Sequence, residues 1–252
     1  EAWFGDAIAT EASVAWNDEA GRVEAVRTKR IGAVVLAQSR IDNPSPELVA
    51  RGVLDGIRRG GLNLLPWTPK SRALCERVNF VNRHLPESFG AMDEATLLKT
   101  LETWLLPYLD GIRDLKGLQK LDLYVILSGL LGWDALQRLD ALAPEAVTVP
   151  SGSTIRIDYA DPGQPVLAVR LQEVFGWERT PTVLEGKMPL MLHLLSPAQR
   201  PVQVTKELSS FWREGYAQVR KELRGKYKKH YWPEDPYEAV ATAKTKKGMA
   251  RG

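Results

Sequence analysis

The chain has 252 residues, a mass of 28.1 kDa and a formal net charge of +3, which excludes a disordered tail or a small disulfide-stabilised scaffold. Its 44% hydrophobic and 26% charged residues are typical of a globular protein, and no apolar run reaches the roughly 18 residues of a membrane span. No membrane partner is therefore expected. The single cysteine, Cys75, excludes an intramolecular disulfide and multi-cysteine metal sites, which favours a reducing compartment and predicts the cytoplasm.

The chain begins at Glu1 without an initiator methionine, and its first residues lack the basic start and apolar core of a signal peptide. We therefore expect a piece of a longer protein. Charge is unevenly placed along it. Residues 200–252 hold 13 Lys and Arg against 6 Asp and Glu, whereas the preceding residues hold 21 against 25. The positive charge thus lies at the C-terminal end.

The first predicted elements are antiparallel strands. Val14 and Trp16 alternate with small or polar residues, and Asn17–Gly21 supplies a turn. Residues 23–30 form the return strand, and residues 31–37 have the composition of a buried strand. Two or three strands are too few for a stable sheet. We expect them to need partners, either later in this chain or in a part that precedes it.

The middle of the chain, residues 44–144, is predicted to form a helical subdomain. Its apolar residues recur with the 3.6-residue period, in segments bounded by Pro, Gly or a capping Asp. Pro107 is expected to kink or end one of the helices. The expected helices cover residues 46–59, residues 69–84, residues 93–109 with Asp93 as N-cap, and two stretches within 115–142.

After Pro144 the hydrophobic period changes to two. Because the predicted strands are short and separated by Pro and Gly, residues 145–236 are expected to form a small barrel or sandwich, closed by an amphipathic basic helix over about 206–224. The fold class is thus α+β, and residues 237–252 are expected to be a disordered basic tail. The strands are expected at 147–149, 154–159, 165–169, 188–195 and 202–204, with a possible helix near 170–176.

The sequence carries no catalytic motif. Gly186-Lys187 is followed by Met188 and not by the Ser or Thr of a phosphate-binding loop, and nucleophile-elbow, HExxH and dinucleotide motifs are absent. Cys75 lies in an amphipathic helix and is expected to be inert. The three histidines, which stand far apart, have no partner motif: His84, His193 and His230. We expect no catalytic residue, metal or cofactor in this chain.

The segment from Lys206 to Lys228 is the one part of the sequence whose pattern of charged and apolar residues indicates a function. At 100° per residue its apolar side chains form one stripe, and six cations share an arc of about 100° on the opposite side. Such an arc can follow nucleic-acid phosphates, with the rings after Lys229 available for stacking. A solvated helix face with cations near the helix C-terminus is the alternative. The predicted nucleic-acid-binding residues are Lys206, Arg213, Arg220, Lys221, Arg224, Lys228 and Lys229.

Two further features have structural and functional interpretations. Arg22, Arg27, Lys29 and Arg30 are either edge-strand charges that deter aggregation or a second binding surface. Trp232, in a rigid Pro-containing stretch, is expected to pack the C-terminal segment back onto the body of the protein.

Several segments, in the same order along the chain, resemble the C-terminal domain of bacterial HrpB-type ATP-dependent helicases. The most specific signature spans residues 200–236 and contains Arg200-Pro-Val-Gln-Val-Thr-Lys-Glu-Leu208, Phe211-Trp212 and Trp232-Pro-Glu-Asp-Pro236. The matching upstream segments are Leu64-Leu-Pro-Trp67, Trp104-Leu-Leu-Pro-Tyr-Leu-Asp-Gly111, Leu121-Asp-Leu123, Val149-Pro-Ser-Gly-Ser153 and Ile155-Arg-Ile-Asp-Tyr159. The resemblance covers almost the whole chain.

The resemblance implies a DEAH-related parent whose ATPase motor, with two RecA-like lobes, lies N-terminal to this chain and binds ATP and Mg²⁺. No motor motif exists here, so no ATP-binding or catalytic residue is carried over. Residues 1–43 would be the terminal strands of an accessory β domain. The expected function is a non-catalytic accessory region that docks on the motor and binds RNA by phosphate charge.

Two alternatives are open. In the first, the chain is a scaffold or protein-docking module, without nucleic-acid binding of its own, whose basic helix meets an acidic protein surface. In the second, it is an enzyme with a pocket formed by residues 147–205, although the sequence contains no catalytic motif that supports this alternative.

Overall fold

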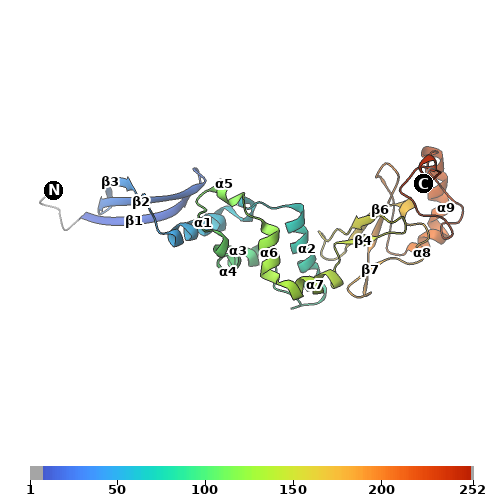
Figure 1. Cartoon of the computed structure of the whole chain (residues 1–252), viewed down its shortest axis with the longest axis horizontal. Helices are drawn as coiled ribbons and strands as arrows, with labels where there is room; N and C mark the ends of the chain where they lie inside the picture. Colours follow the sequence, from blue (N-terminus) through green and yellow to red (C-terminus); the bar gives the residue numbers. More distant parts are fainter. Residues whose placement is uncertain (1–7, 251–252) are drawn as a thin grey trace. The chain divides into compact units, whose positions relative to one another are not determined.

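The computed structural model describes residues 8–250, which form two compact units (Figure 1). Of these described residues, 8–74 and 91–132 form the N-terminal unit, and 75–90 and 133–250 form the C-terminal unit. Residues 1–7, where the sequence shows no signal peptide, and residues 251–252, at the end of the predicted tail, lie outside the described residues. Among the described helices, none is both long and apolar enough to cross a membrane.

An antiparallel sheet opens the N-terminal unit, with strand order β1-β2-β3 (Figure 1). Trp16 lies opposite Val23, so the turn predicted over Asn17–Gly21 joins the first two strands as expected. Gly21 has φ 59°, in the left-handed region that glycine reaches at least cost. The strands are β1 (Ile8–Asn17), β2 (Arg22–Ile31) and β3 (Val34–Arg40).

The third strand differs from the buried strand that its composition predicts. All of its residues are exposed, and the exposed fractions of Val34, Val35 and Leu36 are 62%, 56% and 49%. Within residues 8–250, β3 pairs only with β2, so its outer edge and its apolar side chains are uncovered by this part of the chain. Apolar composition alone does not specify what covers a strand.

Helix α1 (Pro46–Gly60) confirms the prediction over 46–59 and packs against the sheet. Its contact face contains two glycines four residues apart. A Cβ at Gly52 would lie 3.4 Å from the Val23 side chain, and a Cβ at Gly56 would overlap the indole of Trp16. Because these positions lack a side chain, the helix backbone approaches β1 and β2 closely.

The helical middle is more fragmented than predicted. The helix expected over 93–109 begins with the predicted cap, since the Asp93 side chain accepts a hydrogen bond from the Thr96 N–H at 3.0 Å. It is interrupted at Thr100, whose hydroxyl donates back to the Thr96 carbonyl, and again before Pro107. Three helices, not two, follow within 115–142. The helices are α2 (Pro69–His84), α3 (Glu94–Lys99), α4 (Leu101–Trp104), η3 (Leu106–Tyr108), α5 (Leu115–Leu118), α6 (Leu123–Leu131) and α7 (Trp133–Leu142).

The C-terminal unit contains the predicted β-rich region, but its described residues close no barrel. One sheet has the order β10-β9-β6, in which β6 and β9 are parallel, and two further sheets are hairpins. With two to five residues each, the strands are too short to form a continuous closed ladder. The helix expected near 170–176 is a single 3₁₀ turn, η4 (Leu171–Glu173). The strands are β4 (Ala146–Thr148), β5 (Thr154–Arg156), β6 (Val166–Arg170), β7 (Thr182–Val183), β8 (Met188–Pro189), β9 (Met191–Leu195) and β10 (Pro201–Thr205).

The close approach of α1 to the sheet predicts the effect of Gly56→Ala. The added methyl group meets Trp16, which is only 6% exposed and has little room to move. We expect a net loss of about 1–2 kcal/mol in the local stability of the N-terminal unit, after the better helix propensity of Ala is counted. Amide hydrogen exchange of α1 and β1 should then be about tenfold faster.

Gly129→Ala in α6 is the matched control, because a Cβ there meets only the Tyr108 hydroxyl, at an ordinary 3.6 Å. This variant should be slightly stabilised, by roughly 0.5–1 kcal/mol. Unchanged exchange in the Gly56→Ala variant would show that the helix can move away from the sheet without cost.

Candidate nucleic-acid interface

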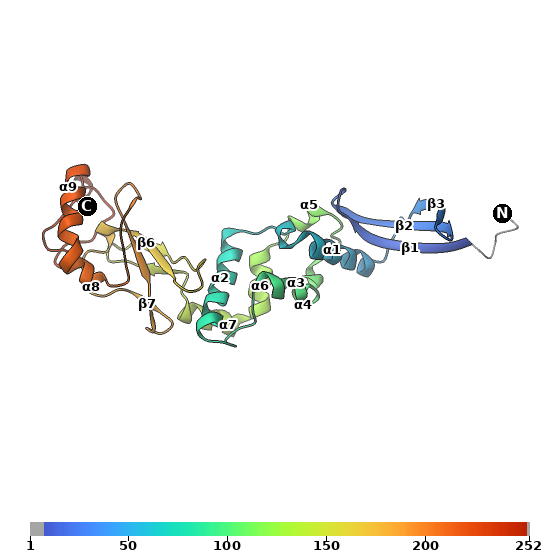
Figure 2. The same ribbon diagram turned by 180° about the vertical axis from the view of Figure 1, so that it is seen from behind.

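The amphipathic helix predicted over about 206–224 is not one continuous α-helix. Lys206 and Glu207 precede it, and α8 (Leu208–Ser210) leads through the π-helical turn η5 (Phe211–Gly215) into α9 (Tyr216–Lys226) (Figure 2). In η5 the Tyr216 N–H bonds to the Phe211 carbonyl, five residues earlier. This wider turn changes the rotation per residue. The cations that precede this turn therefore point in directions other than those that a constant rotation of 100° per residue predicts.

A cluster of four aromatic rings packs around this turn. Ring centroids of Trp212 lie 5.1 Å from Phe211, 5.4 Å from Tyr216 and 6.0 Å from Phe175. A Cβ at Gly215 would lie 2.8 Å from the Phe211 ring, so glycine makes room for it. The Trp212 indole N–H donates to the Trp177 carbonyl at 2.8 Å. The aromatic cluster thus fixes which face of α9 is turned inward.

The segment Trp232–Glu234 lies along α9 and binds one of the predicted cations. Trp232 is 6% exposed, which confirms that it packs onto the body, and its indole N–H donates to the Tyr227 carbonyl at 3.1 Å. Arg220 donates through Nε to the Trp232 carbonyl at 3.2 Å and pairs with Glu234 at 3.0 Å. The Tyr216 hydroxyl donates to the Pro233 carbonyl, and burial raises the pKa of Tyr216. Arg220 therefore holds this segment and is not a free cation.

Beyond the aromatic cluster, one face of α9 lines an open cavity of about 470 Å³, which we call the basic pocket. Residues 221, 224 and 225 are three or four residues apart, so they lie on the same side of α9, and residue 228 follows just after the helix ends at Lys226. No carboxylate lines the cavity, and within residues 8–250 none of its cations forms an ion pair. The basic pocket consists of Lys221, Arg224, Gly225, Lys228 and Lys246.

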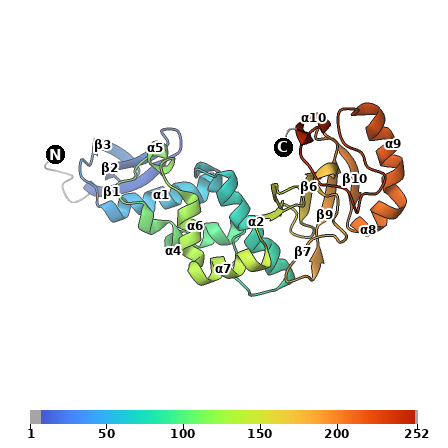
Figure 3. The ribbon, with the colours of Figure 1, turned by 45° about the vertical axis from the view of Figure 1, so that its right-hand side comes forward.

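The fourth cation of the basic pocket, Lys246, comes from the segment that the sequence predicts to be disordered. That segment makes backbone hydrogen bonds with the rest of the C-terminal unit, from Thr242 N–H to the Gln172 carbonyl and from Lys246 N–H to the Lys229 carbonyl, both 2.9 Å. Its short helix α10 (Lys246–Met249) begins at Thr245, whose hydroxyl accepts from the Gly248 N–H (Figure 3). The Thr directly before this Lys-rich run is the sequence feature that could have indicated the start of this helix, because Thr is a favoured N-cap residue.

The remaining predicted cations lie elsewhere on this unit. Lys206, Arg213 and Lys229 are exposed and form no ion pair within the described part of the chain, but they do not line the basic pocket. The structure therefore brings together Lys221, Arg224 and Lys228 from the predicted set.

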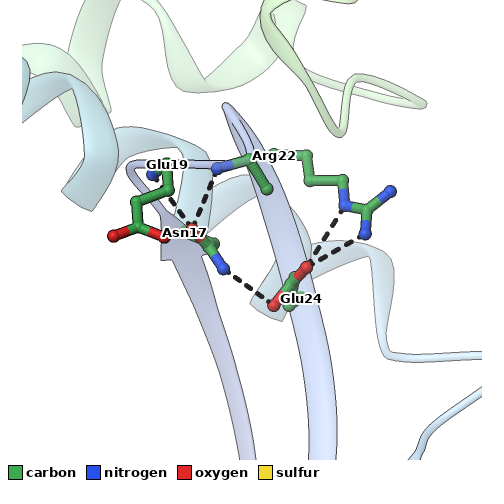
Figure 4. Close-up of polar contacts among 5 residues, drawn as sticks. Asn17, Glu19, Arg22 and Glu24 are labelled. Carbon is green, nitrogen blue, oxygen red and sulfur yellow. Dashed lines mark hydrogen bonds and ion pairs between the residues drawn. The ribbon is translucent and has the colours of Figure 1, made fainter.

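The basic residues of the N-terminal sheet are differently placed. They lie on β2, which pairs on both sides, so the interpretation as edge-strand charges is wrong. Arg22 pairs with Glu24 at 3.1 Å, and Arg30 pairs with Glu11 at 3.4 Å. The Asn17 amide also donates to Glu24, and these two partners hold the pKa of Glu24 below its usual value (Figure 4).

This part of the sheet borders a second cavity of about 390 Å³. Its charged lining is balanced, with three arginines and three carboxylates, so it has no net preference for an anion. The charged residues that line it are Arg22, Arg40, Arg113, Glu24, Asp42 and Asp114. The basic pocket, with four cations and no carboxylate, is therefore the stronger anion site.

The described residues contain no group of three or more His, Cys, Asp or Glu side chains that could hold a metal ion. Cys75 is buried. The His84 ring contacts the Pro162 carbonyl at 3.1 Å, and His230 Nδ1 donates to the Gln172 amide oxygen at 2.8 Å, because the Gln172 amide nitrogen donates to Tyr231. Neither of the two cavities lies between residues 147 and 205.

Residues 104–236 match the protein-family model described as "ATP-dependent helicase C-terminal". Over 236 residues the chain is 44% identical to the ATP-dependent RNA helicase HrpB of Escherichia coli (strain K12), a match that covers 93% of this chain and 29% of that protein. The match to the relative thus involves less than a third of its length.

Two crystal structures of E. coli HrpB are also similar to this chain. One, described as a DExH-box NTPase, has a TM-score of 0.79 and 43% identity over 95% of this chain and 30% of its own. The other, described as a DEAH/RHA helicase, has a TM-score of 0.68 and 42% identity over 90% of this chain and 29% of its own.

His230 allows a test of the geometry beside the basic pocket. Burial and the charge of Arg170 lower the pKa of His230 below its ordinary value. In the unfolded chain His230 binds a proton near pH 6.5, whereas in the folded chain it resists protonation. The stability that this neutral ring contributes is therefore full above about pH 6.5 and is lost as the pH falls toward the folded pKa.

An NMR titration of the His230 ring should give a pKa below about 6.5. Arg170→Gln should raise this pKa, because it removes the nearby positive charge. A His230 pKa at or above the ordinary value would mean that the ring is solvated and that the Gln172 contact does not hold it.

Proposed function

The chain belongs to the family of ATP-dependent helicase C-terminal regions, and we propose from this that it is the non-catalytic accessory region of an HrpB-type RNA helicase. In this proposal it docks on the motor domains of its own parent chain in the cytoplasm. It contributes RNA contacts that do not depend on base sequence. ATP and Mg²⁺ bind to the motor, which is not part of this chain.

The observation that carries the RNA proposal is the set of cations on the C-terminal unit that lack an internal partner. Lysine and arginine held near phosphates release condensed counterions, which favours binding whatever the base sequence. The proposed RNA-contacting residues are Lys206, Arg213, Lys221, Arg224, Lys228 and Lys229. Arg220 has a positioning role, since it binds the Trp232 carbonyl and Glu234.

Base stacking is a weaker part of the sequence prediction. Trp232 is buried and its indole N–H is engaged, so this ring offers no platform to a base. No aromatic side chain lines the basic pocket. Phosphate charge therefore supports the proposal better than base contact does.

Docking on the motor is supported by the N-terminal sheet. Strand β3 exposes three consecutive apolar residues and a free edge, features that folded proteins normally cover. The chain spans about 29% of the length of its E. coli relative, so most of such a parent lies outside it. We infer that a preceding segment of the parent chain covers β3.

A scaffold or protein-docking module is the competing proposal. An acidic protein surface would bind to the same unpaired cations as RNA does. The two proposals differ in the binding that is lost when the cations of the basic pocket are reversed.

The RNA proposal predicts the behaviour of the triple variant Lys221→Glu, Arg224→Glu, Lys228→Glu. Anisotropy of a labelled oligouridine of about 12 nucleotides should show affinity at least roughly tenfold weaker. For the unmodified chain, about six phosphate contacts predict a slope of log affinity against log salt of about −4.2. Losing three of them should weaken the slope to about −2.1.

The matched control reverses three exposed cations of the same unit that lie outside the basic pocket: Arg156→Glu, Arg179→Glu and Lys187→Glu. Equal losses of RNA affinity in the two triple variants would show that RNA responds to the overall positive charge of the unit and not to a specific site. Unchanged RNA affinity in the pocket variant, together with weaker capture of the parent's motor half, would favour the docking module.

A further inference from the structure

We propose that the basic pocket is a binding site for the phosphate backbone of RNA and that the C-terminal segment closes it, with Lys246 as the fourth cation. This inference rests on the proposed function and adds to it a defined site and a role for the segment after Pro236. The sequence predicts this segment to end in a disordered basic tail without a defined site.

The position of Lys246 is set by the fold and not by chance proximity. The carbonyl of Lys229, just beyond the end of α9, accepts the Lys246 backbone N–H at 2.9 Å. The Thr242 N–H is bound to Gln172, and Gly176 donates to the Pro236 carbonyl at 2.8 Å, so the segment is attached at several points. These bonds place a lysine from α10 at the same cavity as three cations from α9 and its extension.

The charges in this cavity repel one another, and nothing inside it compensates for them. Four formal positive charges line it without a carboxylate. Like charges that line one cavity repel one another, and the repulsion is weaker where water separates them. An anion in the cavity removes this repulsion. The negative C-terminal end of α9, equivalent to about half a charge, is too small to do so.

Gly225 leaves space for the anion. It lies four residues after Lys221 on α9, on the face that lines the pocket, and a Cβ there would meet nothing within 4 Å. Residue 225 is helical, where alanine is preferred over glycine by about 1 kcal/mol. The helix itself therefore does not require glycine at this position.

The lining selects the ligand by its chemistry. Ammonium and guanidinium groups donate charge-assisted hydrogen bonds to phosphate oxygens, and the pocket offers no apolar or aromatic side chain to a base. Free phosphate and a backbone phosphate share this chemistry. The same unit also exposes Lys229 and Arg213, which offer further phosphate contacts, and this favours the backbone of a nucleic acid over a free anion.

The first experiment compares Lys246→Ala with Lys247→Ala in the 252-residue chain. Both variants lose one positive charge from the same short helix, but only Lys246 lines the pocket. Affinity for the labelled oligouridine should fall roughly three- to tenfold in Lys246→Ala and less than about twofold in Lys247→Ala. The salt slope should weaken by about 0.7 only in the former.

The second experiment fills the pocket without changing its charge. Gly225→Leu should weaken RNA binding, whereas Gly225→Ala should bind nearly as the unmodified chain does, and neither should lower the unfolding temperature. Inorganic phosphate, added at constant ionic strength, should compete only weakly. Strong competition would identify a free-anion site and overturn the backbone assignment.

The outcomes separate this inference from the proposed function. If Lys221→Glu, Arg224→Glu, Lys228→Glu loses RNA affinity while Lys246→Ala and Lys247→Ala behave alike, the closing role of the C-terminal segment is wrong and the RNA-binding function stands. If the triple variant binds RNA normally, both are wrong. Equal effects of Gly225→Leu and Gly225→Ala would also exclude a phosphate seated on the helix surface.

Discussion

The packing of aromatic rings around the π-helical turn is the constraint on which the C-terminal unit depends. Phe211, Trp212 and Tyr216 pack together with Phe175 around the wider turn, and glycine at position 215 leaves room for the Phe211 ring. The rotation of α9 follows from this packing. It decides which side chains of α9 meet the segment after Trp232 and which meet solvent.

Electrostatic pairing then sorts the cations into two kinds. Arg220 faces the Trp232 segment and is neutralised by Glu234, whereas the cations one and four residues later face a cavity without a carboxylate. The N-terminal unit shows the opposite arrangement, because its arginines are interspersed with acids and line a cavity with balanced charge. Basic composition alone therefore does not identify an anion site. The absence of nearby carboxylates does.

The N-terminal sheet illustrates how a fold can be complete on one face and open on another. Glycines in α1 let the helix pack closely over Trp16 and Val23, so this side needs no further partner. On β3 the apolar side chains of Val34 and Val35 stay in solvent. An apolar strand of this kind is understandable in a chain that spans less than a third of its E. coli relative's length.

The sequence by itself determined the α+β class, helices α1 and α2, the Asp93 cap, the first hairpin and the burial of Trp232, because each depends on local periodicity, turn chemistry or one large apolar side chain. It also located the basic region that includes Lys221, Arg224 and Lys228. Only the tertiary structure decided that Arg220 is paired and that Lys246 joins the pocket. Ion pairing and cavity lining depend on distances between residues that are remote in sequence. A helical wheel with a fixed rotation per residue contains no information on these distances and does not predict a π turn.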